Sequence, residues 1–185
     1  MTTLRSIVLI LAAGALLAAV APARALGATA QVVDNGQFFS PDAVSRANRR
    51  LADVERQTGR SLRVETYAEI PADLRAAYSP DQRARFFADW AQQRARAVKL
   101  TGAMVLVCRE PANISVEVGR QTVESGAFTL ADRDRLLKPM AQAFREKRFD
   151  DGLIGAVETW ATTVSKGRSG APDASAAAAG AASGA

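Results

Sequence analysis

The sequence predicts an α/β domain in which one mixed β-sheet lies between layers of helices. Patterns typical of strands and helices alternate along the chain from Gln31 to Lys166, as they do in layered α/β folds. The run from Ala103 to Cys108 is apolar throughout and contains β-branched residues, which is typical of a strand covered on both faces. We expect this run to be the central strand.

The first elements are a short strand at 31–34, followed by the turn residues Asn35-Gly36, and a helix that begins at Ser40-Pro41. A serine N-cap accepts a hydrogen bond from an unpaired N–H group, and proline fits the first helical position because it has no N–H to leave unpaired. Gly59 ends the helix, since glycine readily adopts the left-handed conformation found after helices. The apolar stripe is Val44, Ala47, Leu51 and Val54.

A second strand and a second helix follow. Apolar and polar residues alternate over 62–66, and the polar members Arg63 and Glu65 indicate a strand near the edge of the sheet. Ser79-Pro80 repeats the helix start, and we expect this helix to run to about Lys99. Its expected buried residues are Phe86, Phe87, Trp90, Ala97 and Val98.

The central strand is expected to form a hairpin with the strand after it. Turn-forming residues occupy 111–113, and beyond them Ile114, Val116 and Val118 alternate with polar residues. This alternation predicts a second strand with one face in water. The polar and small residues at 120–128 predict a loop.

Two further helices complete the domain. Thr129 and Asp132 have the spacing of a capping box at the start of a third helix. An aspartate at 150 or 151 is expected to cap a fourth helix, which ends by residue 167. Gly152 and Gly155 would let this helix approach its neighbour closely. The apolar stripes are Leu136, Leu137, Met140 and Phe144 in the third helix, and Leu153, Val157, Trp160 and Val164 in the fourth.

Both ends of the chain differ in composition from the domain at 31–166. Arg5 precedes an apolar run at 7–20 that is too short to span a bilayer, and Ala-x-Ala sites follow at 23–25 and 28–30. This pattern predicts a signal peptide at 1–25, with cleavage as late as 30, and export to the periplasm or the medium. An uncleaved anchor is the alternative. The Ala/Gly/Ser segment at 167–185 predicts a disordered tail, so no transmembrane helix is expected after cleavage.

Charge and cysteine content restrict the classes of partner. The net charge is +5, and arginines on the predicted helices could contact anionic lipid or wall polymers. Solvated helix faces are the alternative, and without an aromatic platform nucleic acid is not an expected partner. Cys108 is the only cysteine; we expect a buried thiol, with an intermolecular disulfide as the alternative.

The chain contains no histidine, which excludes Ser-His-Asp and Cys-His catalysis and histidine-based zinc sites. No glycine-rich phosphate loop precedes a helix. Asp132-Arg133-Asp134 imitates an aspartyl-phosphate motif, but its place in the first turn of a helix favours a structural role. The remaining chemistry is binding of calcium or magnesium by carboxylates. The candidate ligands are Asp34, Glu117, Glu124, Asp132 and Asp134, with a turn cap at Asp34 and a solvated Glu117 as the alternative roles.

Several motifs, in order and spacing, resemble the TPM domain family of thylakoid-lumen, photosystem II repair and acetylcholine-receptor-associated proteins. They are Val32-Val33-Asp34 with Gly36, Ser40 and Thr58-Gly59; the run 102–107; Val116-Glu117-Val118-Gly119; and the segment 144–153. The resemblance implies a single Rossmann-like three-layer α/β/α sandwich and export across the cytoplasmic membrane. It also implies that some relatives are weak acid phosphatases, that some bind divalent cations, and that others act as accessories of membrane complexes.

The chain departs from the family in the loops at 119–124 and 127–130, where the family carries a glycine-rich motif and Leu-Thr-Asp. Only Asp34 and Glu124 match as metal ligands. We therefore expect a monomeric, exported binding domain rather than an enzyme, acting on an envelope protein or membrane complex, with calcium or magnesium organising its loops. The alternatives are a weak metal-dependent acid phosphatase and a binder of anionic envelope polymers.

Overall fold

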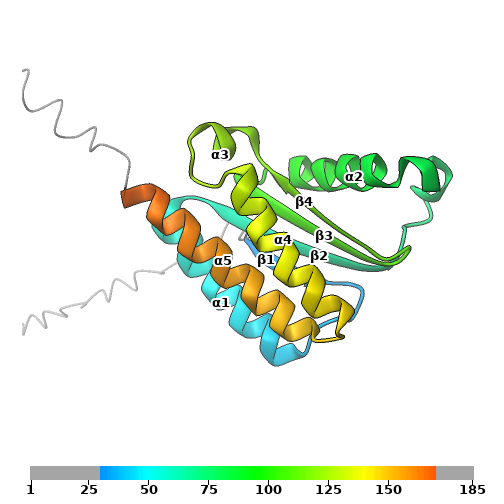
Figure 1. Cartoon of the computed structure of the whole chain (residues 1–185), viewed down its shortest axis with the longest axis horizontal. Helices are drawn as coiled ribbons and strands as arrows, with labels where there is room; N and C mark the ends of the chain where they lie inside the picture. Colours follow the sequence, from blue (N-terminus) through cyan, green and yellow to red (C-terminus); the bar gives the residue numbers. More distant parts are fainter. Residues whose placement is uncertain (1–29, 170–185) are drawn as a thin grey trace, which may run out of the picture.

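A mixed sheet of four strands organises the molecule, as Figure 1 shows for this computed structural model, which describes residues 30–169. The strands are β1 (Gln31–Asp34), β2 (Ser61–Glu69), β3 (Gly102–Glu110) and β4 (Asn113–Val118). They lie in the order β1-β2-β3-β4; the first three are parallel, and β4 runs antiparallel to β3. The predicted α/β class, mixed sheet and hairpin are confirmed. The predicted signal peptide and nearly all of the predicted tail lie outside the described residues.

The second strand lies near an edge of the sheet, as predicted, but it is an inner strand, because β2 pairs with both the edge strand β1 and β3. Its polar residues are accommodated inside the sheet by charge pairing. Glu65 is 0% exposed, and its carboxylate accepts hydrogen bonds from Arg63 at 2.6 Å and from Arg94 at 2.7 Å. A buried carboxylate with these partners is compatible with an inner strand, since buried charges are stable when they are paired.

Within the described part of the chain, five helices surround the sheet: α1 (Pro41–Thr58), α2 (Arg83–Ala97), α3 (Arg120–Glu124), α4 (Leu130–Arg145) and α5 (Phe149–Ser169). Short 3₁₀ turns at Arg75–Ala77 and Pro80–Gln82 precede α2, so the second helix starts later than predicted. The predicted caps of α1 and α4 are confirmed: Ser40 accepts from Ala43 N–H, Gly59 has φ 68°, and Thr129 and Asp132 form a capping box.

Other boundaries differ from the predictions. The expected loop at 120–128 contains the short helix α3, and Ala97 is exposed rather than buried. The fourth helix begins at Phe149 and ends at Ser169. Asp150 lies in its first turn and accepts hydrogen bonds from the N–H and hydroxyl of Ser40, at 2.9 and 2.6 Å, which joins the starts of α1 and α5.

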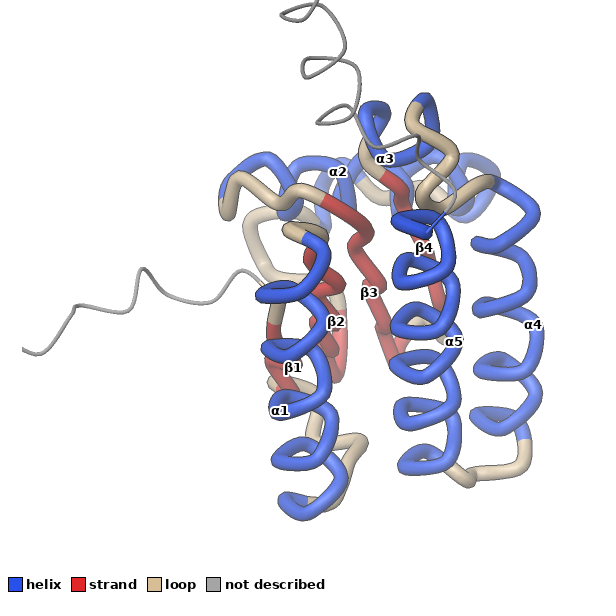
Figure 2. Tube along the Cα trace, turned by 90° about the vertical axis from the view of Figure 1, so that its left-hand side faces the viewer, coloured by secondary structure: helices blue, strands red, loops and turns tan. Residues whose placement is uncertain are grey.

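Two unequal cores lie on the two faces of the sheet. Figure 2 shows α1, α5 and α4 side by side as one layer, with α2 on the other side. Between the three-helix layer and the sheet, Leu51, Val105, Phe128 and Trp160 are buried among many smaller side chains. The smaller core beneath α2 comprises Ile70, Phe87, Trp90, Ala91, Met104, Leu106 and Cys108. The Cys108 thiol is buried there, as predicted.

Glycine permits close packing at one of the two positions predicted in α5. A Cβ at Gly152 would lie 2.9 Å from the Phe144 ring, so this position requires glycine for α5 to contact α4. Gly155 has nothing within 4 Å of such a Cβ and plays no part in packing. Within residues 30–169, no helix has the length and apolar character needed to cross a membrane.

Candidate ligand-binding groove

A groove of about 680 Å³ opens where the carboxyl end of β3 meets the start of β4 and the last turns of α4. Ligands of open α/β sheets commonly bind outside the carboxyl ends of the parallel strands. We call this feature the cationic groove. It is lined by Phe38, Val107, Cys108, Arg109, Ala112, Asn113, Ile114, Leu137, Lys138, Ala141, Phe144, Arg145 and Phe149.

An aromatic cluster forms one wall of the cationic groove. The Phe38 ring lies edge-on to Phe149, with centroids 5.4 Å apart, and 5.7 Å from the Phe144 ring. Phe144 and Phe149 are 5.2 Å apart, also edge-on. Three rings from the loop after β1, from α4 and from α5 therefore present a shared apolar surface, in geometries that aromatic pairs prefer.

Three basic side chains, Arg109, Lys138 and Arg145, line the same groove, and no carboxylate of residues 30–169 does. None of the three forms an ion pair with any residue that the structure describes. Most other arginines of the domain have such partners. The cationic groove is therefore suited to an anionic group attached to an apolar body.

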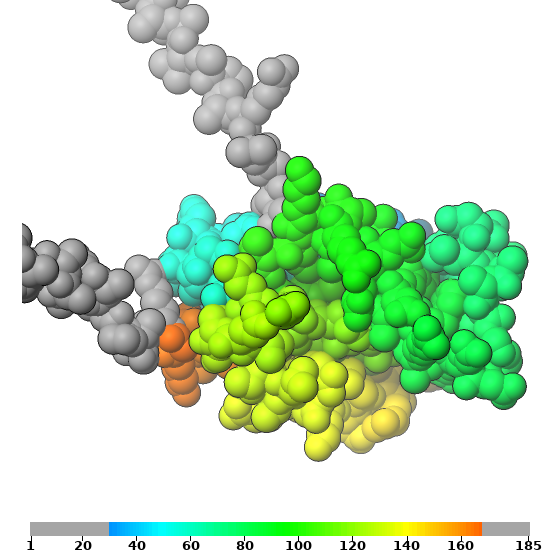
Figure 3. All heavy atoms as spheres, turned by 90° about the horizontal axis from the view of Figure 1, so that it is seen from above, coloured from blue at the N-terminus to red at the C-terminus, as the bar shows by residue number. Residues whose placement is uncertain are grey.

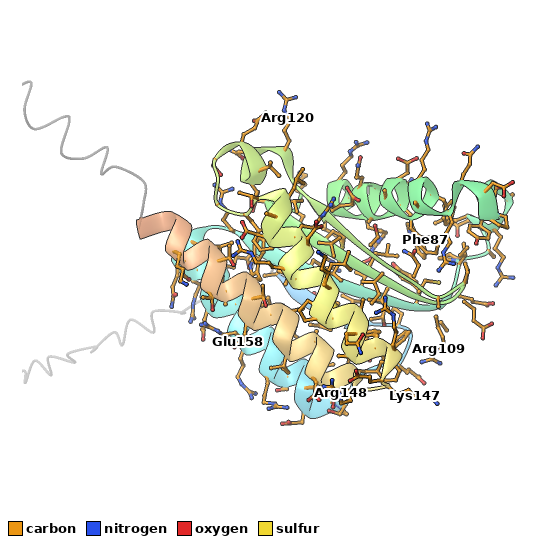
Figure 4. All side chains as sticks on the ribbon, viewed as in Figure 1. Phe87, Arg109, Arg120, Lys147, Arg148 and Glu158 are labelled. Carbon is orange, nitrogen blue, oxygen red and sulfur yellow. The ribbon has the colours of Figure 1, made fainter. Side chains whose placement is uncertain are left out.

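Arg109 is held by contacts with an aromatic ring and a main-chain carbonyl. Its guanidinium lies over the Phe38 ring, 4.6 Å from the centroid, and donates to the carbonyl of Gly36 at 2.8 Å. Stacking on an aromatic face stabilises an arginine without neutralising its charge. Figure 4 shows Arg109 at the same end of the molecule as Lys147 and Arg148. Arg148 is paired with Glu146 and Asp151, whereas Arg109 keeps its charge available for an external anion.

Asp34, a predicted metal ligand, lies at the same end of the sheet and caps the turn after β1. Its carboxylate accepts from the N–H groups of Phe38 and Phe39, at 3.0 and 2.9 Å, and from the Thr66 hydroxyl at 2.5 Å. These bonds fix the loop that carries Phe38 into the groove wall. A cation bound to Asp34 has to compete with these three donors.

Glu124, the other predicted ligand, lies at the opposite end of the sheet. It is in α3, which follows the carboxyl end of β4, and that end pairs with the start of β3 through Val118 and Ala103. Its carboxylate is exposed and pairs with Arg120 at 2.7 Å; Figure 4 shows Arg120 far from Arg109. One ion therefore cannot contact both Asp34 and Glu124. The calcium or magnesium ion stays a prediction, and the described residues contain no cluster of three or more metal-ligating side chains.

The remaining acidic candidates have structural partners. Asp132 is 4% exposed, and burial raises the pKa of its carboxyl. Hydrogen bonds from the hydroxyl and N–H of Thr129, together with the charge and hydrogen bond of Arg135, outweigh burial and lower this pKa. Asp134 pairs with Arg133 at 3.0 Å, and Glu117 accepts from Gln92 at 3.3 Å. The structural role predicted for the Asp132-Arg133-Asp134 sequence is therefore favoured.

The sequence prediction did not include the three groove cations. The available signal was on α4, where Lys138 and Arg145 are two helical turns apart and flank a second apolar row of Leu137, Ala141 and Phe144. Two apolar rows on one helix indicate a second surface besides the core. Arg109 carried no such signal, because its position over Phe38 depends on the loop that Asp34 fixes.

Comparisons with known proteins agree with this fold. The TPM domain family model matches residues 32–163. Among solved structures, the N-terminal domain of a P. gingivalis protein has a TM-score of 0.60 at 16% identity, covering 75% of this chain and 84% of that one. The N-terminal domain of the cg2496 protein of Corynebacterium glutamicum has a TM-score of 0.53 at 16% identity, covering 85% and 88%.

A third similar structure is the BA42 protein of the psychrophilic bacterium Bizionia argentinensis, with a TM-score of 0.52 at 14% identity, covering 71% and 84%. These identities show a shared fold and no more. No curated protein matches the chain. The family match extends over most of the chain and includes all or most of every strand and helix described above. The chain therefore belongs to the TPM domain family.

Proposed function

We propose that this TPM domain is an exported accessory module that binds an acidic and partly apolar segment of an envelope protein or membrane complex in the cationic groove. The observation that supports this most directly is the combination of an aromatic wall with three basic side chains that have no acidic partner in the described part of the chain. Unpaired charges beside apolar surface favour a ligand that supplies the missing carboxylates.

The residues around the groove favour binding over hydrolysis. Its lining contains no carboxylate, serine or threonine that could act as a base or nucleophile. The one thiol, Cys108, is 2% exposed, and burial raises its pKa, which disfavours the reactive thiolate. The chain also has no histidine to act as a general base.

Site-specific photocrosslinking in the exporting cell tests the proposal. A photoreactive phenylalanine analogue replaces Ala112, which is exposed and lines the groove, or Ala84, which is exposed on α2 outside it. We expect the probe at position 112 to crosslink to one defined envelope protein and the probe at 84 to give no such product.

Charge reversal supplies the matched control. Lys138→Glu with Arg145→Glu should abolish the crosslink from position 112. Arg49→Glu with Lys166→Glu changes the net charge equally at exposed positions outside the groove and should leave it intact. Equal crosslinking in both double variants would show that the groove cations do not select the partner. Phosphatase activity of the purified protein that requires Asp34 would favour the enzymatic alternative instead.

A further inference from the structure

We infer that the occupant of the cationic groove is an extended peptide whose main chain pairs with the free edge of β4 at Ile114. This inference rests on the proposed function and names the form in which the partner is bound. It starts from the hydrogen-bonding pattern of the β3–β4 hairpin, which decides which main-chain groups of β4 point into the groove.

The ladder between β3 and β4 leaves the N–H and C=O of Ile114 unpaired. In an antiparallel pair, opposed residues alternate between pairs that exchange both hydrogen bonds and pairs that exchange none. Gly119 N–H donates to the Gly102 carbonyl at 2.7 Å, one position beyond the Ala103–Val118 pair. Gly102 and Gly119 are therefore a hydrogen-bonded pair, and every second pair along the hairpin from there is also bonded. By this count Cys108 and Asn113 exchange hydrogen bonds, whereas Val107 and Ile114 do not. The main-chain groups of Ile114 therefore point away from β3.

The opposite side of β3 gives the same result. Ser61 N–H donates to the Thr101 carbonyl at 3.0 Å, which directs the main-chain groups of Thr101, and of every second residue after it, toward β2. Val107 belongs to this set, so its N–H and C=O are unavailable to Ile114. No turn or side chain within residues 30–169 bonds to the main chain of Ile114.

The two edges of the sheet differ in how they are protected. At the β1 edge, the Asn48 side chain of α1 accepts the outward N–H of Val32 at 2.8 Å. Proteins commonly cover edge strands in such ways, because unpaired main-chain groups bind other strands. At the β4 edge, Val116 is covered, being 4% exposed, whereas Ile114 is half-buried and lines the groove. Figure 3 shows α2 in green and α4 in yellow on either side of the band of intermediate colour that includes β4.

An extended peptide matches this surface in two ways. One residue opposite Ile114 can accept its N–H and donate to its C=O, as in strand addition to other sheet edges. Every second side chain of a strand points to the same side, so the peptide residues that face α4 can include apolar ones at the aromatic wall and acidic ones at Lys138 and Arg145. An acyl chain with a carboxylate could satisfy the charges but would leave both polar groups of Ile114 without partners.

Peptide binding with and without main-chain donors tests the inference. The purified protein is titrated with synthetic peptides of about ten residues, random in sequence except for aspartate at every fourth position, which leaves the other positions of the same face free for apolar residues. The tightest binder is then N-methylated at one residue at a time, which removes a single N–H and keeps the side chains. We expect about a tenfold loss of affinity at one or two positions and little change at their neighbours. The Ile114 amide proton should exchange about tenfold more slowly in the complex.

The outcomes separate this inference from the proposed function. In one outcome, Lys138→Glu with Arg145→Glu abolishes peptide binding, but no N-methylation weakens it and the exchange rate of the Ile114 amide proton is unchanged. Strand pairing is then wrong, and binding in the groove stands. Binding of dodecanoate or of phosphatidylglycerol vesicles with no peptide bound assigns the groove to lipid and overturns the inference. If no probe binds and the charge reversal changes nothing, both proposals fail.

Discussion

Single residues in this domain show that a buried charge can have a structural role. Glu65 is 0% exposed on an inner strand, and its carboxylate accepts from Arg63, Arg94 and, at 2.8 Å, the Tyr67 hydroxyl. Burial raises the pKa of Glu65, but these hydrogen bonds outweigh burial and hold it below its ordinary value of 4.5. Burial, followed by the hydrogen bond to Glu65 and the charge of its carboxylate, raises the pKa of Tyr67 to about 12, although the charges of Arg94 and Arg63 act in the opposite direction.

The Glu65 carboxylate should make the fold sensitive to acid. A carboxyl whose pKa is lower in the folded than in the unfolded state stabilises the fold above the unfolded value, and this stability is lost as pH falls through the folded value. Glu65→Gln should therefore flatten the decline in unfolding free energy below about pH 4.5 and cost roughly 3 kcal/mol near neutral pH, because the arginines lose their counter-charge.

Urea denaturation between about pH 3 and 7 measures this effect. Glu158→Gln is the matched control, because it breaks an exposed pair with Arg50 and should change stability by less than about 0.5 kcal/mol. If the unfolding free energy falls with pH as steeply in Glu65→Gln as in the wild type, other carboxyls cause the acid sensitivity.

Asp34 should stabilise the domain without a cation. Asp34→Ala leaves the N–H groups of Phe38 and Phe39 without their acceptor and should cost about 1–3 kcal/mol, or several degrees in melting temperature. We expect the same loss in chelator and in millimolar calcium or magnesium, and a smaller one for Asp34→Asn, which keeps an acceptor oxygen. A calcium- or magnesium-dependent rise in the wild-type melting temperature that Asp34→Ala removes would instead reveal a metal site.

At the scale of elements, the helices and strands that were predicted correctly are those whose sequence signals lie within a few residues of one another. Both ends of α1 and the start of α4 were correct because each cap contacts residues three or four positions away. The hairpin was correct for the same reason. The burial of Glu65 on β2 was not predicted, because Glu65 is neutralised by Arg94 of α2, a contact that depends on the tertiary fold. The short helix α3 gives no apolar periodicity to detect.

The groove was beyond prediction from the sequence for a related reason. Its parts come from four separate places: the loop after β1, the β3–β4 hairpin, the end of α4 and the start of α5. Taken alone, the sequence of each part has the pattern of ordinary core or surface residues. Of the two predicted metal ligands only Asp34 lies near it, and that residue shapes the groove wall rather than lining the groove.

The contact between β2 and β3 requires glycine at one position. A Cβ at Gly102 would lie 1.9 Å from the Ser61 carbonyl oxygen, a main-chain atom of the neighbouring strand. Gly102→Ala should therefore cost roughly 3 kcal/mol or more, because the strands themselves have to separate. Gly155→Ala, at an open helical site, should instead stabilise by about 0.5–1 kcal/mol. Thermal unfolding of both variants measures the contrast, and equal effects would contradict it.

At the scale of the whole molecule, the two layers differ in how firmly they are held. The helices α1, α4 and α5 share one large core, whereas α2 packs alone over a smaller one. Segments with fewer buried apolar contacts open at lower free energy than the rest of a protein. We therefore expect α2 to open while the sheet and the other three helices stay folded.

Native-state hydrogen exchange should show α2 amides exchanging at a lower free energy than those of α1 and α5. Trp160 is buried in the large core and stays packed when α2 opens. Trp160→Ala should therefore lower the opening free energy of the α1 and α5 amides by about 3–5 kcal/mol. The opening free energy of the α2 amides should stay unchanged until the value for α1 and α5 falls to meet it. Phe87 is buried beneath α2 and loses its contacts in either opening, so Phe87→Ala should lower both values. If wild-type α2 exchanges at the same free energy as α1 and α5, the domain unfolds as one unit, and the cationic groove forms and disappears together with the α2 layer.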